Sequence, residues 1–403
     1  MALRKLATDA LARGVLASES LVGKELSSIP KAWASTSAAV KVKNNRKTED
    51  LKDLPKRTVF ISQSSDIFSN LALEDWLYKN WSFERRNVLL LWRNSPCVVI
   101  GRHQNPQVEA NLSYLESAGV PLARRGSGGG AVYHDHGNLN CTFFTTRDRY
   151  DRHTNLEMIC RALHLDFGIQ AHPNSRDDII MDHDHKVSGS AAKLGRSTAY
   201  HHCTLLVNTD RHQLKLTLNG DKSIKSKATA STPAHVMNLS EMKPGITVEQ
   251  VLTSVGRAFL GHDQALANGF TLVNPTDEWF PGLGELEAVL RSARWLEGQT
   301  PRCTITRSVP IPQGLLPHAS NTSLAVTVQA YHGLVEEVRM EDDTEKEGVA
   351  ELVQDIGAGL RGAPFTSDTF NIIAGRLRFS PALTHFPLPA SARPIPTPTR
   401  SVI

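Results

Sequence analysis

Apolar residues follow two kinds of pattern along the chain, short continuous runs and helical spacings. The runs from Val88 to Trp92 and from Cys97 to Ile100 predict two buried strands, joined by a proline-containing turn at residues 93–96. After Asp66, a residue type that favours helix N-termini, apolar side chains recur at helical spacing. Further strands are expected at residues 58–63, 131–133, 141–145, 179–181, 186–188 and 203–207, and further helices at residues 111–117, 154–167 and 247–260. This mixture predicts an α/β domain.

The composition changes at residues 274–282, where two prolines and a glycine interrupt the periodicity and predict a linker. Beyond it, residues 323–331 alternate, His332-Gly333 predicts a turn, residues 334–340 pair back, and residues 344–360 have helical spacing. The last 23 residues contain six prolines and are expected to be disordered. The expected organisation is a leader at residues 1–50, a first domain at 57–274, a small α+β accessory domain at 275–380 and a disordered tail at 381–403.

The composition is that of a soluble globular protein. A chain of 403 residues, 40% of them hydrophobic, is long enough for a large core. No apolar run approaches the roughly 18 residues that a membrane helix needs, so we expect no membrane partner. Five cysteines without a CxxC pair fit a reducing compartment better than a disulfide framework.

The net charge of +4 is unevenly distributed along the chain. Residues 1–57 contain 12 Lys and Arg against 6 Asp and Glu, whereas the remainder contains 33 against 35. The basic leader is rich in Ala and Ser and carries Leu3, Leu6 and Leu11 at amphipathic spacing. It predicts a mitochondrial transit peptide and a location in the matrix, and a disordered extension is the alternative because the leader also contains acidic residues. The near-neutral remainder argues against a nucleic-acid partner.

The most distinctive motif is RRGSGGGAVYHD at residues 124–135. Glycines let a ligand approach backbone N–H groups closely, and arginine offers a fork of donors that matches phosphate or carboxylate. The motif predicts an anion site, although a glycine-rich hairpin turn explains the isolated motif equally well. Gly126, Gly128 and Ala131 formally match the dinucleotide fingerprint GxGxxA, but that fingerprint opens a helix, whereas here a strand is expected after the glycines.

Two later segments, SRDDI at residues 175–179 and HKVSGSA at residues 185–191, place charges beside expected strands. Lys186 precedes a tight, hydroxyl-lined turn, where its ammonium group can be held against an oxygen of an acyl phosphate. From the spacing alone, an ordinary surface lysine and a surface ion pair between Arg176 and Asp178 are the alternatives.

Histidines suggest a metal site in three places, but none has the spacing of zinc ligands. We therefore expect no metal, and explain the histidines as hydrogen-bonded loop residues. The three places are His134-x-His136, His183-x-His185 and His201-His202-Cys203.

Together these motifs resemble the lipoate-protein ligase A and lipoyltransferase family. The resemblance covers roughly residues 70–281, and a weaker similarity extends to residues 295–301. It is strongest to the mitochondrial lipoyltransferases of animals. It rests on LLLWRNSPCVVIGRHQNP (89–106), RRGSGGGAVYHDHGN (124–138), DRHTNLEMICRAL (151–163), HKVSGSAAKLGRSTAYHHCTLLVNTD (185–210) and KATAS (227–231).

The resemblance implies both a fold and a site. The implied fold is α/β (α+β), with a large mixed-sheet catalytic domain related to biotin and lipoate protein ligases and a small C-terminal α+β domain. Lys186 is the implied catalytic residue, contacting the acyl carbonyl and the phosphate of lipoyl-AMP. Donors such as Lys186 and Arg125 can stabilise charge in the transition state by about 3 kcal/mol each. The implied lipoyl-AMP-binding residues are Arg125, Gly128, Gly129, Gly130, Ala131, Val132, Tyr133, Arg176, Asp178, Lys186, Thr204, Thr229 and Ala230.

The implied activity is transfer of a lipoyl group from lipoyl-AMP, or from the lipoylated glycine cleavage H protein, to a lysine of a lipoyl domain. The implied acceptors are the E2 subunits of the pyruvate, 2-oxoglutarate and branched-chain 2-oxo acid dehydrogenases. Lipoyl-AMP is then a substrate, and no tightly bound cofactor is expected.

Three alternatives to this activity remain open. An ATP-dependent ligase would perform both activation and transfer, and the unusual C-terminal unit leaves the activation step open. In the second alternative, the enzyme would form an acyl thioester at its own Cys203 during transfer. A non-catalytic lipoyl-binding module is disfavoured because Lys186, Arg125 and the whole glycine loop are present.

Overall fold

The computed structural model describes residues 55–261, 269–310, 323–340, 347–366 and 368–378. The chain forms two compact units. The first comprises residues up to Asp221 and Thr229–Gln299, and the second comprises Lys222–Ala228 and the residues from Thr300 onwards. The chain therefore leaves the first unit for seven residues, returns to it, and leaves it again at Thr300.

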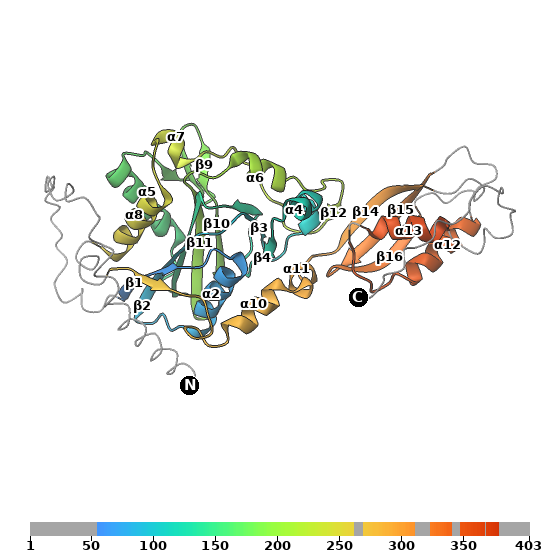
Figure 1. The fold of residues 1–403 in the computed structure, drawn as a ribbon, viewed down its shortest axis with the longest axis horizontal. Coiled ribbons are helices and arrows are strands. Elements are labelled where there is room, and N and C mark those ends of the chain that lie inside the picture. Colours follow the sequence, from blue (N-terminus) through green and yellow to red (C-terminus); the bar gives the residue numbers. More distant parts are fainter. Residues whose placement is uncertain (1–54, 262–268, 311–322, 341–346, 367, 379–403) are drawn as a thin grey trace, which may run out of the picture. The chain divides into compact units, whose positions relative to one another are not determined.

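A mixed six-stranded sheet forms the centre of the first unit (Figure 1). Its strand order is β10-β11-β6-β2-β1-β13, in which β1 is parallel to both β2 and β13 and the remaining pairs are antiparallel. The strands are β1 (Lys56–Ser62), β2 (Arg86–Trp92), β6 (Asn138–Thr146), β10 (Ser190–Leu194), β11 (Thr198–Leu206) and β13 (Thr271–Val273).

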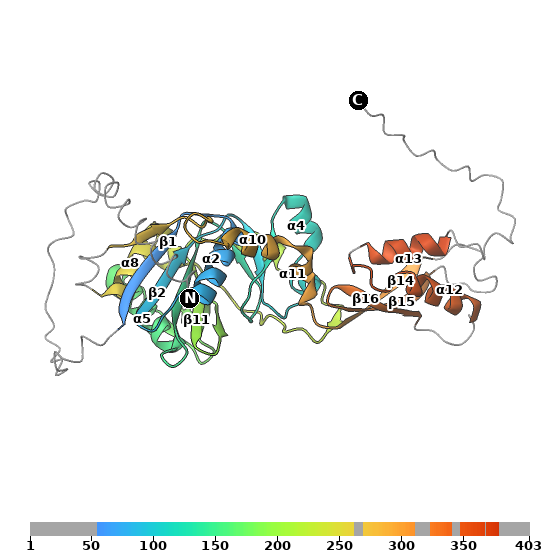
Figure 2. The same cartoon turned by 90° about the horizontal axis from the view of Figure 1, so that it is seen from below.

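Helices cover both faces of this sheet (Figure 2). Both faces need this cover because the run from Val88 to Trp92 places apolar side chains on each of them, as is typical of a strand buried on both faces. Leu89 and Leu91 belong to the core beneath two helices, whereas Val88, Leu90 and Trp92 belong to the core on the opposite face. The first pair of helices is α5 (Arg152–Phe167) and α8 (Val248–Leu260), and the second pair is α2 (Ile67–Asn80) and α10 (Leu283–Arg291).

Two small sheets carry the segments singled out in the sequence. In the first, β3 pairs in parallel with β4 and antiparallel with β5, so the glycine loop connects the two outer strands. In the second, β9 pairs with β8, and Gly189 then leads directly into β10 at the edge of the main sheet. The strands are β3 (Cys97–Ile100), β4 (Leu122–Arg124), β5 (Val132–His134), β7 (His172–Pro173), β8 (Ile179–Met181) and β9 (His185–Ser188).

In its described ranges, the second unit consists of an antiparallel sheet with helices α12 and α13 packed against it. Its strand order is β12-β14-β15-β16, and α12 packs against β16 while α13 packs against β14. The β15–β16 hairpin turns at His332 and Gly333, both with positive φ as two-residue hairpin loops require. The elements are β12 (Lys225–Ser226), β14 (Cys303–Pro310), β15 (Ser323–Tyr331), β16 (Leu334–Met340), α12 (Glu347–Ala358) and α13 (Thr369–Arg378).

The predicted linker at residues 274–282 lies inside the first unit, because the chain divides at Thr300. Gly282 adopts a left-handed conformation and begins α10, which packs against α2. The indole of Trp76 also donates to the carbonyl of Pro281 at 2.9 Å. Residues 275–299, expected in the accessory domain, thus fold with the first unit. The shorter helices are α3 (Pro106–Glu109), α4 (Leu112–Ala118), α6 (Arg211–Thr217), α7 (Leu239–Met242) and α11 (Ala293–Gly298).

The predicted α/β class and most predicted elements match the structure. Asp66 is the N-cap of α2, accepting from the amides of Phe68 and Ser69. Of the predicted helix at residues 344–360, α12 spans Glu347–Ala358, and residues 344–346 lie outside the described residues, as do the leader and the tail. Within the ranges described, no helix is long and apolar enough to cross a membrane.

Candidate functional site

The first unit contains a cavity of about 330 Å³, a volume typical of small-molecule sites. It is lined by almost all of the residues predicted to bind lipoyl-AMP. Tyr133 and Gly128 are the exceptions: Val132 faces the cavity, and the strand alternation turns Tyr133 into a separate apolar core. The predicted residues that line the cavity are Arg125, Gly129, Gly130, Ala131, Val132, Arg176, Asp178, Lys186, Thr204, Thr229 and Ala230.

Arg125 holds the glycine loop together from within. Its Nη2 donates to the carbonyls of Gly128 and Gly130 at 2.6 and 2.8 Å, and its Nε donates to the Ser127 hydroxyl at 3.0 Å. Burial lowers the pKa of Arg125 to about 10, which leaves it charged at neutral pH. Most of its donors are therefore committed to the loop itself, so Arg125 fixes the shape of this side of the cavity.

Ser231, which also lines the cavity, is hydrogen-bonded to the glycine loop. Its hydroxyl accepts from the amide of Ala131 at 2.8 Å and from the side chain of Gln104 at 3.1 Å. The amide of Thr229 donates to the carbonyl of His103 at 3.1 Å. These bonds hold the segment from Thr229 to Thr232 beside the glycine loop, and all four of its residues line the cavity. Ser231 was absent from the prediction, although its KATAS motif was singled out.

Lys186 and Asp178 form an ion pair at the cavity, with Nζ 2.9 Å from Oδ1. Asp178 is buried and precedes β8, and its amide donates to the Asn174 side chain, which also accepts from the amide of Arg176. Arg176 is more exposed and lies 4.0 Å from Asp178. The small β7-β8-β9 sheet thus brings together three charges that the sequence placed in two separate segments.

The turn after Lys186 is fixed to the main sheet. Gly189 and Thr204 exchange two hydrogen bonds, one from the Gly189 amide to the Thr204 hydroxyl at 3.1 Å and one from the Thr204 amide to the Gly189 carbonyl at 3.0 Å. The amide of Lys186 donates to the carbonyl of His235 at 2.8 Å. The backbone on both sides of Lys186 is therefore held, while its side chain is about one quarter exposed.

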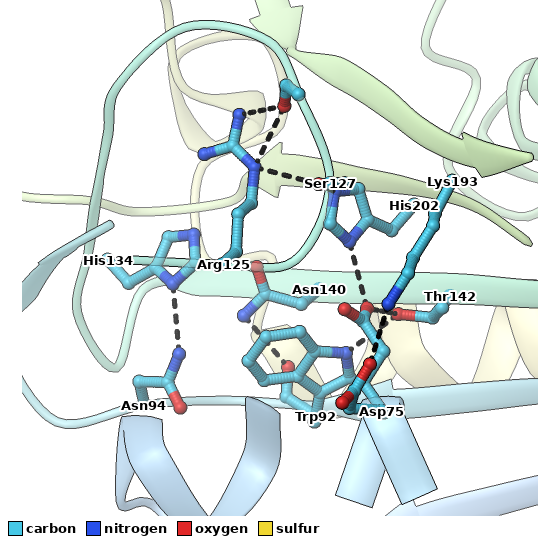
Figure 3. A network of polar contacts seen from close by, with 12 residues as sticks. Asp75, Trp92, Asn94, Arg125, Ser127, His134, Asn140, Thr142, Lys193 and His202 are labelled. Atoms are coloured by element: carbon cyan, nitrogen blue, oxygen red, sulfur yellow. Dashed lines mark hydrogen bonds and ion pairs between the residues drawn. The ribbon is translucent and has the colours of Figure 1, made fainter. Parts of the chain in front are cut away.

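A buried polar network lies behind the cavity (Figure 3). Glu74 accepts from His202 Nδ1 at 2.8 Å and from the Thr142 hydroxyl at 2.9 Å, and His202 Nε2 is 2.9 Å from the Ser127 hydroxyl. Burial raises the pKa of Glu74, but the electrostatic attraction of His202, together with the hydrogen bonds from His202 and Thr142, outweighs it and holds this pKa below its ordinary value. The network continues through Ser127 to Arg125, and so connects helix α2 with the glycine loop.

Little in the sequence indicates these partners. Glu74 lies among the apolar residues of α2, where a buried acid is a signal that a partner is needed. Its partner His202 is 128 positions away and could not be identified without the register of β11. Among the residues that the structure describes, no group of three or more His, Cys, Asp and Glu side chains is arranged to hold a metal ion.

Comparison with known proteins first places the chain in a class. The profile described as lipoyl protein ligase A/B catalytic domain matches residues 66–260. The LipL1 protein of P. falciparum, solved in complex with lipoate, is 26% identical with a TM-score of 0.53, over 79% of this chain and 93% of its own. A lipoate-protein ligase A solved with bound ATP has a TM-score of 0.50 at 24% identity, over 60% of this chain and 98% of its own. The fold is thus that of the lipoyl protein ligases.

Relatives found by sequence identify the family more closely within this class. The mitochondrial lipoyl amidotransferase of Homo sapiens is 42% identical over 71% of this chain and 76% of its own length. The lipoate-protein ligase A of Bdellovibrio bacteriovorus is 39% identical over 61% of this chain and 74% of its own. The chain belongs to the family of lipoyl amidotransferases and lipoate-protein ligases. These relatives confirm the predicted family, fold class, acyltransferase activity on lipoyl groups and mitochondrial location.

Proposed function

We propose that the protein transfers a lipoyl group from lipoyl-AMP, or from the lipoylated glycine cleavage H protein, to a lysine of E2 lipoyl domains. The acceptors would be the pyruvate, 2-oxoglutarate and branched-chain 2-oxo acid dehydrogenases. The observation that carries the proposal is the Lys186–Asp178 pair in the wall of a cavity that is also lined by buried apolar side chains such as Trp92 and Val99. That the transferred acyl group is lipoyl is inferred from the family to which the chain belongs.

The chemistry assigned to Lys186 follows from its position. The neutral acceptor amine attacks the carbonyl carbon of the mixed anhydride, a C–N bond forms, and the bond from carbon to the phosphate oxygen breaks. AMP leaves with the bonding electrons, and the new amide nitrogen releases one proton to water. Negative charge grows on the carbonyl oxygen and on the phosphate, so a fixed cation beside both lowers the barrier. Without a ligand, the charge of Lys186 is balanced by Asp178 at 2.9 Å. Lipoyl-AMP would replace part of this pairing with its own oxygens.

No side-chain nucleophile is required for this reaction. Cys203 lines the cavity and is buried, so a thioester intermediate is the second candidate route. Cys203 faces Cys141 across β11 and β6, and burial together with a hydrogen bond to Cys203 raises the pKa of Cys141 well above its usual value. Attack by the acceptor amine on the adenylate needs no thiolate at either cysteine. Direct transfer is therefore the route we propose.

The test is an acyl-transfer assay with three donors. Purified protein is incubated with an apo-lipoyl domain and with lipoate plus ATP, lipoyl-AMP or lipoylated H protein, and the acceptor is weighed by intact mass spectrometry. An acceptor domain whose target lysine is replaced by arginine is the control. We expect a gain of one lipoyl group with at least one of the preformed donors and none on the control.

Each outcome has a definite meaning. Gain only from lipoyl-AMP or H protein identifies a transferase without activation, and gain from lipoate plus ATP identifies a complete ligase. No gain with any donor refutes the proposal. If Cys203→Ser abolished transfer while Lys186→Ala retained it, the thioester route would replace the one proposed here.

A further inference from the structure

One edge of the main sheet begins at the candidate site. β10 is the last strand in the order of that sheet, and among the strands of the described ranges it pairs only with β11. Gly189, Ser190 and Ala191, at the start of this edge, line the cavity. A Cβ added at Gly189 would lie 3.5 Å from the ammonium nitrogen of Lys186. A molecule that binds along β10 therefore lies beside the proposed reaction centre.

Two hydrogen bonds at the ends of β10 show which of its backbone groups point away from β11. The amide of Thr204 donates to the carbonyl of Gly189 at 3.0 Å, and the amide of Gly195 donates to the carbonyl of Thr198 at 2.9 Å. In an antiparallel pair, every second residue bonds the neighbouring strand. Since Gly189 and Gly195 do so, the odd-numbered residues between them do as well. The residues whose N–H and C=O point outwards are Ser190, Ala192 and Leu194.

These outward backbone groups are unpaired in the part of the chain that the structure describes. There, no hydrogen bond joins them to another main-chain or side-chain atom. The glycine loop packs on Ala191, where a Cβ added at Gly129 would lie 3.2 Å from the Ala191 Cβ, but the loop makes no hydrogen bond to the outward groups. Backbone N–H and C=O groups on a free edge are a template for a further strand.

Proteins usually protect such an edge, and β10 lacks the usual protection. The opposite edge strand, β13, is only three residues long, whereas β10 has five residues and no proline. The one charged side chain of β10, Lys193, is turned onto Asp75, with Nζ 2.7 Å from Oδ1 (Figure 3). The side chains of Ser190 and Ala192 are small, and Leu194 is 49% exposed. An unprotected edge at this position indicates a partner that binds as a strand.

The transfer reaction indicates which partner fits this edge. The acceptor must bring a lysine amine to the acyl carbonyl, which is proposed to lie beside Lys186. A strand paired with β10 lies about 4.8 Å away, so a lysine opposite Ala191 can extend its flexible four-carbon stem into the cavity. A second copy of this chain is the competing occupant, but nothing in the transfer reaction requires one.

We propose that β10 is the docking edge for the acceptor: an extended segment of the lipoyl domain, which carries the target lysine, pairs with Ser190, Ala192 and Leu194 as an additional strand. This inference rests on the proposed function. Pairing through the main chain gives affinity that depends little on the partner's side chains. It therefore allows one enzyme to accept several different lipoyl domains.

The test compares Ala192→Pro with Ala192→Ser in the full chain. Proline removes the outward N–H but no bond to β11, and it is tolerated on an edge strand whose N–H faces solvent, whereas serine keeps the N–H. Each variant receives lipoyl-AMP with an apo-lipoyl domain or with hydroxylamine, a small amine that needs no docking. The first readout is the KM for the domain. The second is the rate of transfer to the domain divided by the rate of hydroxamate formation in the same sample, so that a loss of folded protein cancels.

A second measurement needs no variant. Amide hydrogen exchange of the wild type is followed residue by residue, with and without a lipoyl domain whose target lysine is replaced by arginine. We expect exchange at Ser190, Ala192 and Leu194 to slow by about fivefold or more when the domain is saturating, because their amides become hydrogen-bonded. If Ala192→Pro does not fold, this measurement alone decides.

We expect the KM of Ala192→Pro for the domain to be about tenfold or more above that of Ala192→Ser, with a corresponding fall in the ratio of the two rates. Equal values in the two variants, or exchange along the edge that the domain does not slow, would overturn the inference. Slowing that depends on enzyme concentration without the domain would identify a second copy as the occupant and overturn it too. A wild type that transfers lipoyl to neither the domain nor hydroxylamine would instead refute the proposed function.

Discussion

Replacing Gly129 by alanine tests how the glycine loop works. Gly129 has φ of +89°, a conformation that L residues rarely adopt. An added Cβ would lie 2.9 Å from Nη2 of Arg125 and 3.2 Å from the Cβ of Ala191. The first contact is with the nitrogen that bonds the carbonyls of Gly128 and Gly130. The change therefore strains the backbone and pushes away the side chain that holds the loop.

The expected cost in free energy is the sum of two contributions. Left-handed backbone in a residue with a side chain costs about 1–2 kcal/mol, and weakening a hydrogen bond from a charged donor costs about 1.5–3 kcal/mol. A total of about 3 kcal/mol is expected, which is roughly a hundredfold. Gly128 is the matched control, because its added Cβ would meet nothing within 4 Å and its φ is not positive.

The assay is transfer from lipoyl-AMP, with urea unfolding measured on the same samples. Gly129→Ala should lose about a hundredfold in kcat/KM and at most about 3 kcal/mol in unfolding free energy, since the loop can relax locally. Gly128→Ala should stay within about threefold of the wild type. Equal activities in the two variants would refute the idea that the left-handed position and Arg125 together shape the site.

Three further predictions concern charge and burial. Lys186→Met should lower transfer by at least about a hundredfold. Lys243→Met, which removes an exposed lysine that does not line the cavity, should leave transfer within about threefold; equal losses in steady-state assays would contradict this. Arg125→Lys should lower transfer by about tenfold or more, because an ammonium group cannot satisfy several loop carbonyls in a fixed plane, and a wild-type rate would count against that role. Burial lowers the pKa of His134 and His201 to about 3 each, below the unfolded value near 6.5, so unfolding free energy should fall on acidification from pH 7.5 to 5.5 by about 1 kcal/mol per histidine. His201→Gln should remove its share of that slope in urea titrations, and an unchanged slope would show that His201 is not buried neutral.

The sequence predicted elements best where one local rule decided the outcome. The apolar run of β2 could only be a strand buried on both faces, and Asp66 could be assigned as an N-cap from its residue type alone. The prediction differed from the structure at Gly282, where the same signals that mark a linker also begin a helix. Only the packing of α10 on α2 distinguishes the two cases, and packing is not visible in local spacing.

The site was predictable only in its contiguous parts. Lys186 and the glycine loop stand out as motifs, and their positions at one cavity are as expected. The partners that fix them come from distant segments: Ser231 bonds Ala131 one hundred positions away. His134, which lines the cavity, is contacted by Asn94 and through it by Asn70, a chain of three side chains whose order follows from tertiary packing. Such chains cannot be inferred from one sequence, because each link is set by register and not by spacing.

The excursion of residues 222–228 into the second unit has a practical meaning for protein engineering. Because β12 is an edge strand of the second unit's sheet, that unit is not a simple appendage that a stop codon after Gln299 would remove. Such a truncation would leave Lys225 and Ser226 without the strand they pair with, immediately before the cavity segment that starts at Thr229. A chimera that exchanges the second unit must therefore replace both residues 222–228 and the residues from Thr300 onwards. If only the second stretch is replaced, the original β12 must pair with a β14 strand from another protein.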